Sequence, residues 1–355
     1  MAAQSIHWVP STRALRSHRL RLRLAAVLIA TVLSLVVVLW GMDVGRSVDA
    51  MLAYDVVWIV PLLLVVTVVL VLRALRYQLL LDHPMSLKEM LPIVAVSFLA
   101  ISVVPLRMGE LVRPYLLAEK HGVPFGAAMA AVVLERLFDM VALLILLGAT
   151  GLFVDLPESI VVGGLDLLAV GQSTLAISAS VGFAGVLALA FAGGRIVPVV
   201  VAIAAAVSPG LADAIENLLM RFVDGLRVLV SNPGRTALAG LCTVGTWSLM
   251  LSTVWLSMMG MEGIAASVDL VLLNWSSAMM GTVLFPTPGF LGAFEAPSVV
   301  SLMVMGVERE VATAYSLGLH ALLLGHSIVI GLGVMAWEGW SLMTLVRASQ
   351  VAEPE

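Results

Sequence analysis

The sequence predicts an all-α integral membrane protein: a polytopic helix bundle with six full spans plus two broken or re-entrant helical hairpins in inverted repeats. Composition is the first observation, since 61% of the 355 residues are hydrophobic and 12% are charged. Ordinary globular domains are about 45–50% apolar and about 25% charged. The mean hydropathy is +1.08, and long apolar runs recur along the chain. The formal net charge of -4 is spread out, which argues against a nucleic-acid partner.

Six apolar runs are long enough to cross a hydrocarbon core of about 30 Å. They lie at 24–41, 56–72, 125–154, 174–192, 236–260 and 311–337. The segment 211–230 mixes apolar and charged residues, and this pattern predicts an amphipathic helix on the membrane surface. The segment 196–207 is short and contains Pro198, so a hairpin, a surface segment and part of a span all remain open.

The N-terminal residues 1–23 are predicted to form a basic cytoplasmic tail, because five arginines precede the first apolar run. A cleaved signal peptide is the alternative, but that run is longer than most signal-peptide cores. Six spans then place the tail at 348–355 in the cytoplasm as well, with 24–347 forming the transmembrane domain. On this topology Arg73 and Arg76 lie in the cytoplasm, and only Arg46 and Arg309 lie outside.

Two further apolar runs are short and end in helix-breaking residues. The run 91–104 stops at Pro105, and the run 268–285 stops at the Pro-Thr-Pro-Gly segment 286–289. Proline cannot donate a backbone hydrogen bond and glycine lets the chain turn. Irregular backbone at membrane depth is tolerated only where it is buried in protein or lines a cavity. We therefore expect two broken helices, with ordinary loops between full helices as the alternative.

The two breaks belong to an internal repeat. Each is followed by an acidic residue, a Gly-Val pair (122–123 and 306–307) and an alanine-rich helix start. Three predicted spans lie between the units, so the second unit enters the membrane from the opposite side. Inverted repeats with broken helices recur in secondary transporters. His320 and His326 are expected to be cavity or helix-contact residues, because their spacing does not suit a shared metal.

Charged residues near the first break suggest a site for an anionic group. Arg107 and Arg113 could hold a lipid phosphate, since arginine binds phosphate through a planar fork. Glu110 and Glu135 could pair with them when the site is empty. The alternative for Arg113 and Lys120 is snorkelling to the cytoplasmic surface.

A helical turn carries three more charges, because Glu135 and Asp139 share one face and Arg136 lies beside them. These groups are expected to converge with Glu295 on one cavity, because charge at membrane depth needs a partner. A structural ion-pair network is the alternative. The full set of predicted substrate-binding residues is Arg107, Gly109, Glu110, Arg113, Glu135, Arg136, Asp139, Pro286, Pro288, Gly289, Gly292 and Glu295.

Two signatures carry a family resemblance. The first is the run 107–113 (RMGELVR) followed by Gly122 and the run 133–139 (VLERLFD), and the second is 286–289 (PTPG) with Gly292 and Glu295. Together they resemble the lysylphosphatidylglycerol synthase transmembrane-region family. Where that family usually has a second adjacent glycine, this chain has Phe290. The resemblance implies a flippase-like fold that moves lipid between leaflets. It does not imply lysine transfer, which belongs to a separate soluble domain.

The predicted function is therefore transport of a phospholipid or polyprenyl-linked lipid between leaflets of the cell membrane. The expected ligand is a membrane lipid with an anionic head group, and a homo-oligomer or a membrane transferase is a further candidate partner. The alternative is a non-transporting partner of a glycosyl- or aminoacyl-transferase in envelope lipid biosynthesis. An enzyme is not expected, because no nucleophile–base pair or Walker motif is visible. No cofactor or metal is expected.

Overall fold

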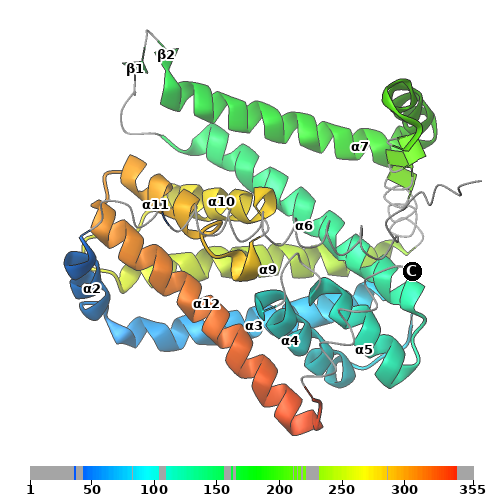
Figure 1. The fold of residues 1–355 in the computed structure, drawn as a ribbon, viewed down its shortest axis with the longest axis horizontal. Helices are drawn as coiled ribbons and strands as arrows, with labels where there is room; N and C mark the ends of the chain where they lie inside the picture. The colour runs from blue at the N-terminus through cyan, green and yellow to red at the C-terminus, as the bar shows by residue number, and fades with distance from the viewer. Residues whose placement is uncertain are drawn as a thin grey trace, which may run out of the picture.

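The computed structural model describes residues 36, 43–81, 83–103, 109–155, 161–162, 165–210, 212–213, 215–216, 219–220, 232–285 and 287–341. Their longer helices are α2 (Val44–Leu52), α3 (Ile59–Leu80), α4 (Leu87–Val103), α5 (Val112–His121), α6 (Phe125–Phe153), α7 (Leu167–Val207), α9 (Pro233–Met259), α10 (Val268–Leu284), α11 (Glu295–Val304) and α12 (Arg309–Glu338). Two 3-10 turns, η1 (Val56–Trp58) and η3 (Pro288–Phe290), and one antiparallel pair of two-residue strands, β1 (Val161–Val162) and β2 (Leu165–Asp166), complete the described elements. The predicted all-α helix bundle is confirmed (Figure 1).

Three described helical segments are long and apolar enough to cross a membrane: Val56–Leu80, Pro233–Met259 and Arg309–Trp337. They match the predicted spans at 56–72, 236–260 and 311–337. The predicted spans at 125–154 and 174–192 are also helical, within the 29-residue α6 and the 41-residue α7. The predicted span at 24–41 apart from residue 36, most of the segment 211–230, and the predicted tails 1–23 and 348–355 lie outside the described residues.

The segment 196–207, which the sequence left open, continues α7. The backbone departs from helical geometry at Ala192 (φ -129°), and Pro198 follows within the second limb. A proline in a helix removes one backbone hydrogen bond and bends the helix. The segment is therefore the limb of α7 that follows a kink, and not a separate hairpin.

Both predicted breaks are present. α4 ends at Val103 and α10 ends at Leu284, and each is 17 residues long. The 10-residue α5 and α11 follow and pack against α4 and α10 respectively. Neither apolar run is part of a straight, complete span, so the prediction of two broken helical hairpins is confirmed.

The element lengths show the internal repeat directly. The first unit has helices of 17, 10 and 29 residues in α4–α6, and the second has 17, 10 and 30 in α10–α12. Each unit is preceded by a long apolar helix, α3 or α9, and these two pack against each other. The packing is reciprocal, because α4 contacts α12 and α10 contacts α6. In Figure 1, α12 crosses the bundle from beside α2 to beside α4.

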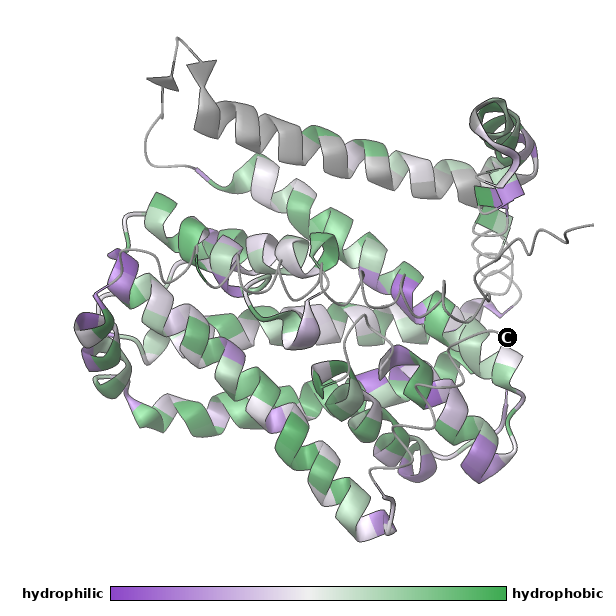
Figure 2. Cartoon of the chain, viewed as in Figure 1, coloured by the Kyte–Doolittle hydropathy of each residue, from purple (hydrophilic) through white to green (hydrophobic). Residues whose placement is uncertain are grey.

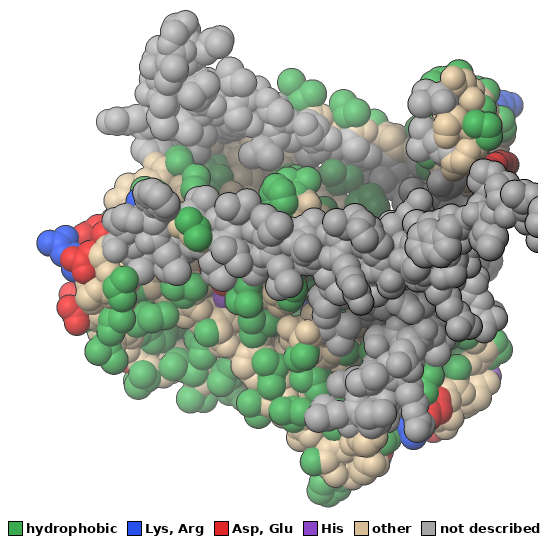
Figure 3. Space-filling model, viewed as in Figure 1, with side chains coloured by type: hydrophobic (Ala, Val, Ile, Leu, Met, Phe, Trp, Pro, Cys, Tyr) green, Lys and Arg blue, Asp and Glu red, His purple; other side chains and the backbone are tan. Residues whose placement is uncertain are grey.

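Apolar side chains cover the outside of the bundle as well as its core. Figure 2 shows hydrophobic residues along many of the helices, and Figure 3 shows them over the lower surface, with charged groups at the end that carries α2 and at the opposite side of the view. Val60, Leu64 and Val329 are among the exposed large hydrophobic residues. In water such a surface would be unfavourable, whereas in a bilayer it faces lipid tails of equal polarity. The chain is therefore a membrane protein.

Candidate functional site

The first candidate site is a group of seven charged residues between α3, α5 and α6, called here the charged cluster. Its members are Arg73, Arg76, Glu110, Arg113, Glu135, Arg136 and Asp139. Glu135 lies at its centre and is buried. One carboxylate oxygen accepts a hydrogen bond from Arg76 Nη2 at 2.8 Å, and the other accepts one from Arg113 Nη1. A single carboxylate thus holds two helices against α6.

Arg73 and Arg76 are the members that sequence reasoning missed, and Arg76 is the more deeply buried of the two. The predicted topology placed both in the cytoplasm, but the Arg76 side chain is only 1% exposed. Its Nη1 donates to Asp139 Oδ1 at 2.7 Å and to Thr243 Oγ1 at 3.1 Å. The reason is that α3 continues to Leu80, eight residues beyond the predicted apolar run, and carries the guanidinium into the bundle. The apolar residues that follow Arg76 were the signal in the sequence that the helix continues past the predicted run.

Arg113 is buried, which rules out snorkelling to the surface. Its Nε and Nη2 both donate to Ser97 Oγ at 3.2 Å, and its guanidinium lies 4.6 Å from the ring centroid of Tyr77. Since Nη1 also donates to Glu135, each nitrogen of the guanidinium group has a hydrogen-bond acceptor. Lys120, the other residue considered for snorkelling, lies 5.9 Å from the ring centroid of Trp340.

Arg136 and Arg73 are held less tightly. The Arg136 side chain is 39% exposed, and its contacts with Asp139, Glu110 and Glu135 measure 3.6, 3.9 and 3.9 Å. The Arg73 guanidinium lies 4.8 Å from the Phe98 ring centroid. Both residues have a buried Nε–H without an acceptor among the described residues. A buried donor without a partner costs about 1–3 kcal/mol, so these two groups favour an anionic ligand.

The cluster carries more positive than negative charge. Four guanidinium groups face three carboxylates, which leaves one surplus positive charge among the described residues. Charge at membrane depth is costly unless it meets a partner. Trp247 Nε1 donates a further hydrogen bond to the carboxylate of Asp139 at 3.4 Å. The arrangement is therefore suited to hold an anion.

Glu295 does not join the charged cluster and instead forms a second centre with His320. Glu295 Oε1 lies 2.6 Å from His320 Nδ1, and Oε2 accepts the Gly292 N–H at 2.7 Å. The two side chains are 1% and 6% exposed. The expectation that Glu295 would meet the charges of the first hairpin is thus not met, because the imidazole on α12 supplies the partner that a buried carboxylate needs.

The second break lies against the first hairpin. Gly289 has φ of 57°, and a Cβ there would lie 3.0 Å from the Ser102 carbonyl oxygen near the end of α4. Phe290 has φ of 59°, a left-handed conformation that favours glycine. The backbone thus keeps a glycine-like geometry at the position where the family usually has its second glycine. Pro288 opens the short turn η3 that contains both residues.

The first break also depends on glycine. A Cβ at Gly109 would lie 2.4 Å from the backbone nitrogen of Ile101, so the chain after the break lies directly on α4. Arg107 and Pro286, which the sequence predicts as site residues, lie outside the described residues. Their roles remain predictions.

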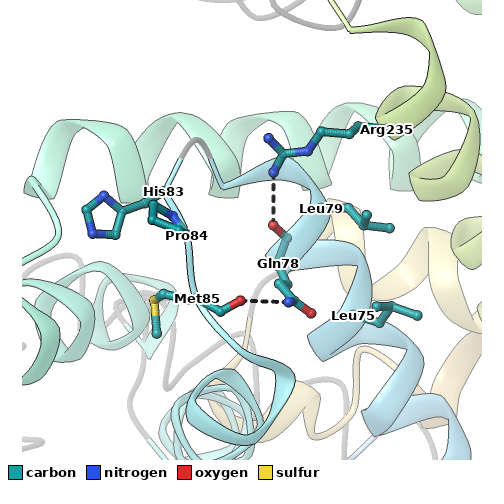
Figure 4. Close-up of a pocket in the computed structure, with 7 residues that line it drawn as sticks. All are labelled: Leu75, Gln78, Leu79, His83, Pro84, Met85 and Arg235. Carbon is teal, nitrogen blue, oxygen red and sulfur yellow. Dashed lines mark hydrogen bonds between the residues drawn. The ribbon is translucent and has the colours of Figure 1, made fainter.

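A separate pocket of about 490 Å³ lies at the end of α3 (Figure 4). It is lined by Leu75, Gln78, Leu79, His83, Pro84, Met85 and Arg235, none of which belongs to the charged cluster. Arg235 Nη2 donates to the carbonyl oxygens of Leu81 and Gln78 at 2.9 and 3.3 Å, and Gln78 Nε2 donates to Met85 at 2.7 Å. Arg235 therefore satisfies carbonyls that the end of a helix leaves unpaired.

Metal-binding geometry is not found among the described residues, where no group of three or more His, Cys, Asp or Glu side chains could hold an ion. The first centre offers guanidinium groups that can bind an anion, and the second offers a buried carboxylate–imidazole hydrogen bond.

Comparison with known proteins supports the family resemblance. The model of the family described as lysylphosphatidylglycerol synthase TM region matches residues 23–331. A Haloferax volcanii protein named glycosyltransferase AglD is 24% identical over 353 residues, which cover 93% of this chain and 56% of the relative. The chain thus spans little more than half the length of that relative, and no solved structure matches it significantly. The chain belongs to the lysylphosphatidylglycerol synthase transmembrane-region family.

Proposed function

We propose that this protein is a flippase-like transporter that moves a phospholipid or a polyprenyl-linked lipid between the leaflets of the cell membrane. The transport uses no catalytic chemistry of the chain's own. The charged cluster carries this proposal, because it holds a surplus positive charge and three buried Nε–H groups without an acceptor among the described residues, those of Arg73, Arg76 and Arg136. An anionic lipid head group would supply the missing acceptor and the missing negative charge.

Arg136 and Arg73 are the residues best placed to contact the head group. Arg76 and Arg113 already pair with Glu135 at close range, so their guanidinium groups stay with the protein. Arg136 is partly exposed and has only long ion-pair contacts. Arginine recognises phosphate through two parallel N–H groups, and each charge-assisted hydrogen bond is worth about 1.5–3 kcal/mol. Arg107, next to this cluster in sequence, stays a predicted fifth cation.

The meeting of the two breaks also supports transport. Helix breaks at membrane depth occur where backbone is buried in protein or lines a cavity. Broken helices at the interface between inverted repeats are a recurring feature of secondary transporters. Here the turn of the second unit rests on the end of α4 in the first, at Gly289 and Ser102.

Leaflet-to-leaflet movement in proteoliposomes tests the proposal. Purified protein is reconstituted with a fluorescent anionic phospholipid, and transport is followed by quenching from outside. We expect Arg73→Gln and Arg136→Gln each to slow transport about tenfold, the effect of about 1.4 kcal/mol. Arg136→Lys and Arg107→Lys should also slow it, because lysine keeps the charge and loses the fork.

The matched control is Arg46→Gln, which removes an arginine paired with Glu308 on the exposed end of the bundle. It should transport like the wild type. Wild-type rates in the Arg73→Gln/Arg136→Gln double variant, at equal protein levels, would overturn the proposed head-group site.

The proposed orientation places both termini in the cytoplasm. Cysteines introduced at Gln4 and Gln350 should be protected from a membrane-impermeant thiol reagent in intact cells. Labelling of either from outside would contradict the topology.

A second candidate is a non-transporting membrane partner of a glycosyltransferase. It is favoured by one comparison, since the relative is named a glycosyltransferase and the present chain matches only 56% of it. This candidate predicts that the purified chain moves no lipid, but that it binds a membrane transferase and raises the transferase's turnover.

A further inference from the structure

The Glu295–His320 pair is a buried titratable site that head-group binding does not use. We propose that it is a proton-binding site that couples lipid transport to a proton gradient across the membrane. This inference rests on the transport function proposed above and names the driving force. It is carried by the contacts of the pair and by the strained turn to which the pair is bonded.

The two side chains of the pair are joined by a hydrogen bond. Glu295 Oε1 and His320 Nδ1 are 2.6 Å apart, a distance at which one of the two atoms carries the proton between them. The side chains are 1% and 6% exposed, so a gain or loss of a proton changes the net charge inside the protein, where net charge is costly. Exchange therefore requires that water reach the pair.

The surroundings contain no other described charge within ion-pair distance of either group. Facing them are the Phe294 ring, 4.7 Å from the imidazole, and Ser316 Oγ, 3.5 Å from the Glu295 carbonyl oxygen. Trp275 of α10 lies behind Phe294. The next histidine on α12 is His326, whose Nε2 bonds Thr67 of α3 at 2.9 Å. Among the described residues, the pair therefore has no third charged side chain within ion-pair distance.

The pair is tied to a strained turn. Oε2 of Glu295 accepts the Gly292 N–H at 2.7 Å. Gly289, Phe290 and Gly292 have positive φ angles of 57°, 59° and 77°. A left-handed residue other than glycine costs about 1–2 kcal/mol, so contacts must hold Phe290 in place. A hydrogen bond to an ionised carboxylate is roughly twice as strong as a neutral one, so protonation of Glu295 weakens one of those contacts.

The turn connects the pair to the charged cluster through packed elements. Gly289 rests on the Ser102 carbonyl oxygen near the end of α4. Five residues earlier on the same helix, Ser97 accepts two hydrogen bonds from Arg113. The helix α4 thus contacts the turn at Ser102, near its end. About one and a half helical turns earlier, at Ser97, it contacts Arg113 of the charged cluster. Movement of the turn on protonation would shift α4 against Arg113.

The test uses full-length protein in vesicles of phosphatidylcholine with a fluorescent phosphatidylglycerol. Transport is measured with and without an imposed pH gradient, and a trapped pH dye reports proton movement. We expect the gradient to speed wild-type transport several-fold in one direction, and a protonophore to remove the effect. Glu295→Gln and His320→Asn should transport at a rate that no longer depends on the gradient.

His326→Asn is the matched control, because His326 lies on the same helix outside the pair, and its response to the gradient should be that of the wild type. Folding of each variant is checked by monodisperse elution. Infrared difference spectra between acidic and alkaline buffer give a readout independent of transport: the wild type should show a protonated-carboxyl band that Glu295→Gln lacks.

The outcomes separate the two proposals. Lipid transport that ignores the gradient in the wild type, or gradient dependence that survives in Glu295→Gln, overturns the coupling and leaves the transport function standing. A wild-type protein that moves no lipid overturns the transport function, and the coupling with it.

Discussion

Replacement of Glu135 by glutamine tests how the charged cluster is held together. The carboxylate of Glu135 sits between the guanidinium groups of Arg76 and Arg113, and all three side chains are buried. Glutamine has nearly the same shape and can still accept hydrogen bonds. The substitution therefore removes one negative charge, leaves Arg76 with the carboxylate of Asp139, and leaves Arg113 without its carboxylate partner.

The expected loss of stability is large. Breaking a buried ion pair by removing one partner costs about 3–5 kcal/mol, because the other charge stays buried without compensation. An exposed ion pair is worth about 0–1 kcal/mol. Arg46 and Glu308, with side chains 69% and 58% exposed, form such a pair at 3.3 Å. Glu308→Gln is therefore the matched control, the same chemical change at an exposed pair.

The assay measures unfolding of the purified protein in mild detergent. Unfolding is induced either by titration with a denaturing detergent or by heating. Glu135→Gln should unfold far earlier than the wild type, and Glu308→Gln should match the wild type. The double variant Arg113→Met/Glu135→Gln should recover part of the loss, because it removes one uncompensated cation. If Glu135→Gln were as stable as Glu308→Gln, the cluster would not stabilise the bundle and the reasoning would be refuted.

Three further changes test the packing of the fold. Gly331→Ala should destabilise the protein by about 1–3 kcal/mol through overpacking, because its Cβ would lie 2.4 Å from Leu99 Cβ, whereas Gly333→Ala meets nothing within 4 Å and should be tolerated. Both are compared by thermal unfolding. Phe290→Gly should relieve about 1–2 kcal/mol of left-handed strain and loosen the turn, which faster backbone hydrogen exchange at the turn would show. Arg235→Gln should speed exchange at the end of α3 and leave lipid transport unchanged, since it removes hydrogen bonds of about 1 kcal/mol each to carbonyls there.

Much of the fold could be predicted because a bilayer restricts what a backbone can do. Apolar runs of sufficient length must be helices, so the helices around 56–72, 236–260 and 311–337 follow from hydropathy alone. The two breaks follow from proline and glycine after short apolar runs. The repeat was visible as an order of residue types, and the structure adds the matching helix lengths, which no local pattern encodes.

The site was predictable only in part, because sequence shows which residues are charged and not which helix faces meet. Glu135, Arg136 and Asp139 are close in sequence, and one helix brings them together. Arg76 comes from another helix, and its position depends on how far α3 extends past an apolar run. The pairing of Glu295 with His320 depends on how α11 folds back onto α12, which spacing along the chain does not determine.

The reciprocal packing of the two repeats has a consequence for how the protein is made. During synthesis α4 is complete long before α12, the helix on which it packs, has left the ribosome. In the same way, α6 is made before α10, and α2 is made before α12, the helices that they contact. Contacts between such distant segments form late, because chain closure must come first. The first unit therefore enters the membrane with surfaces that α10 and α12 cover only once the second unit has been made.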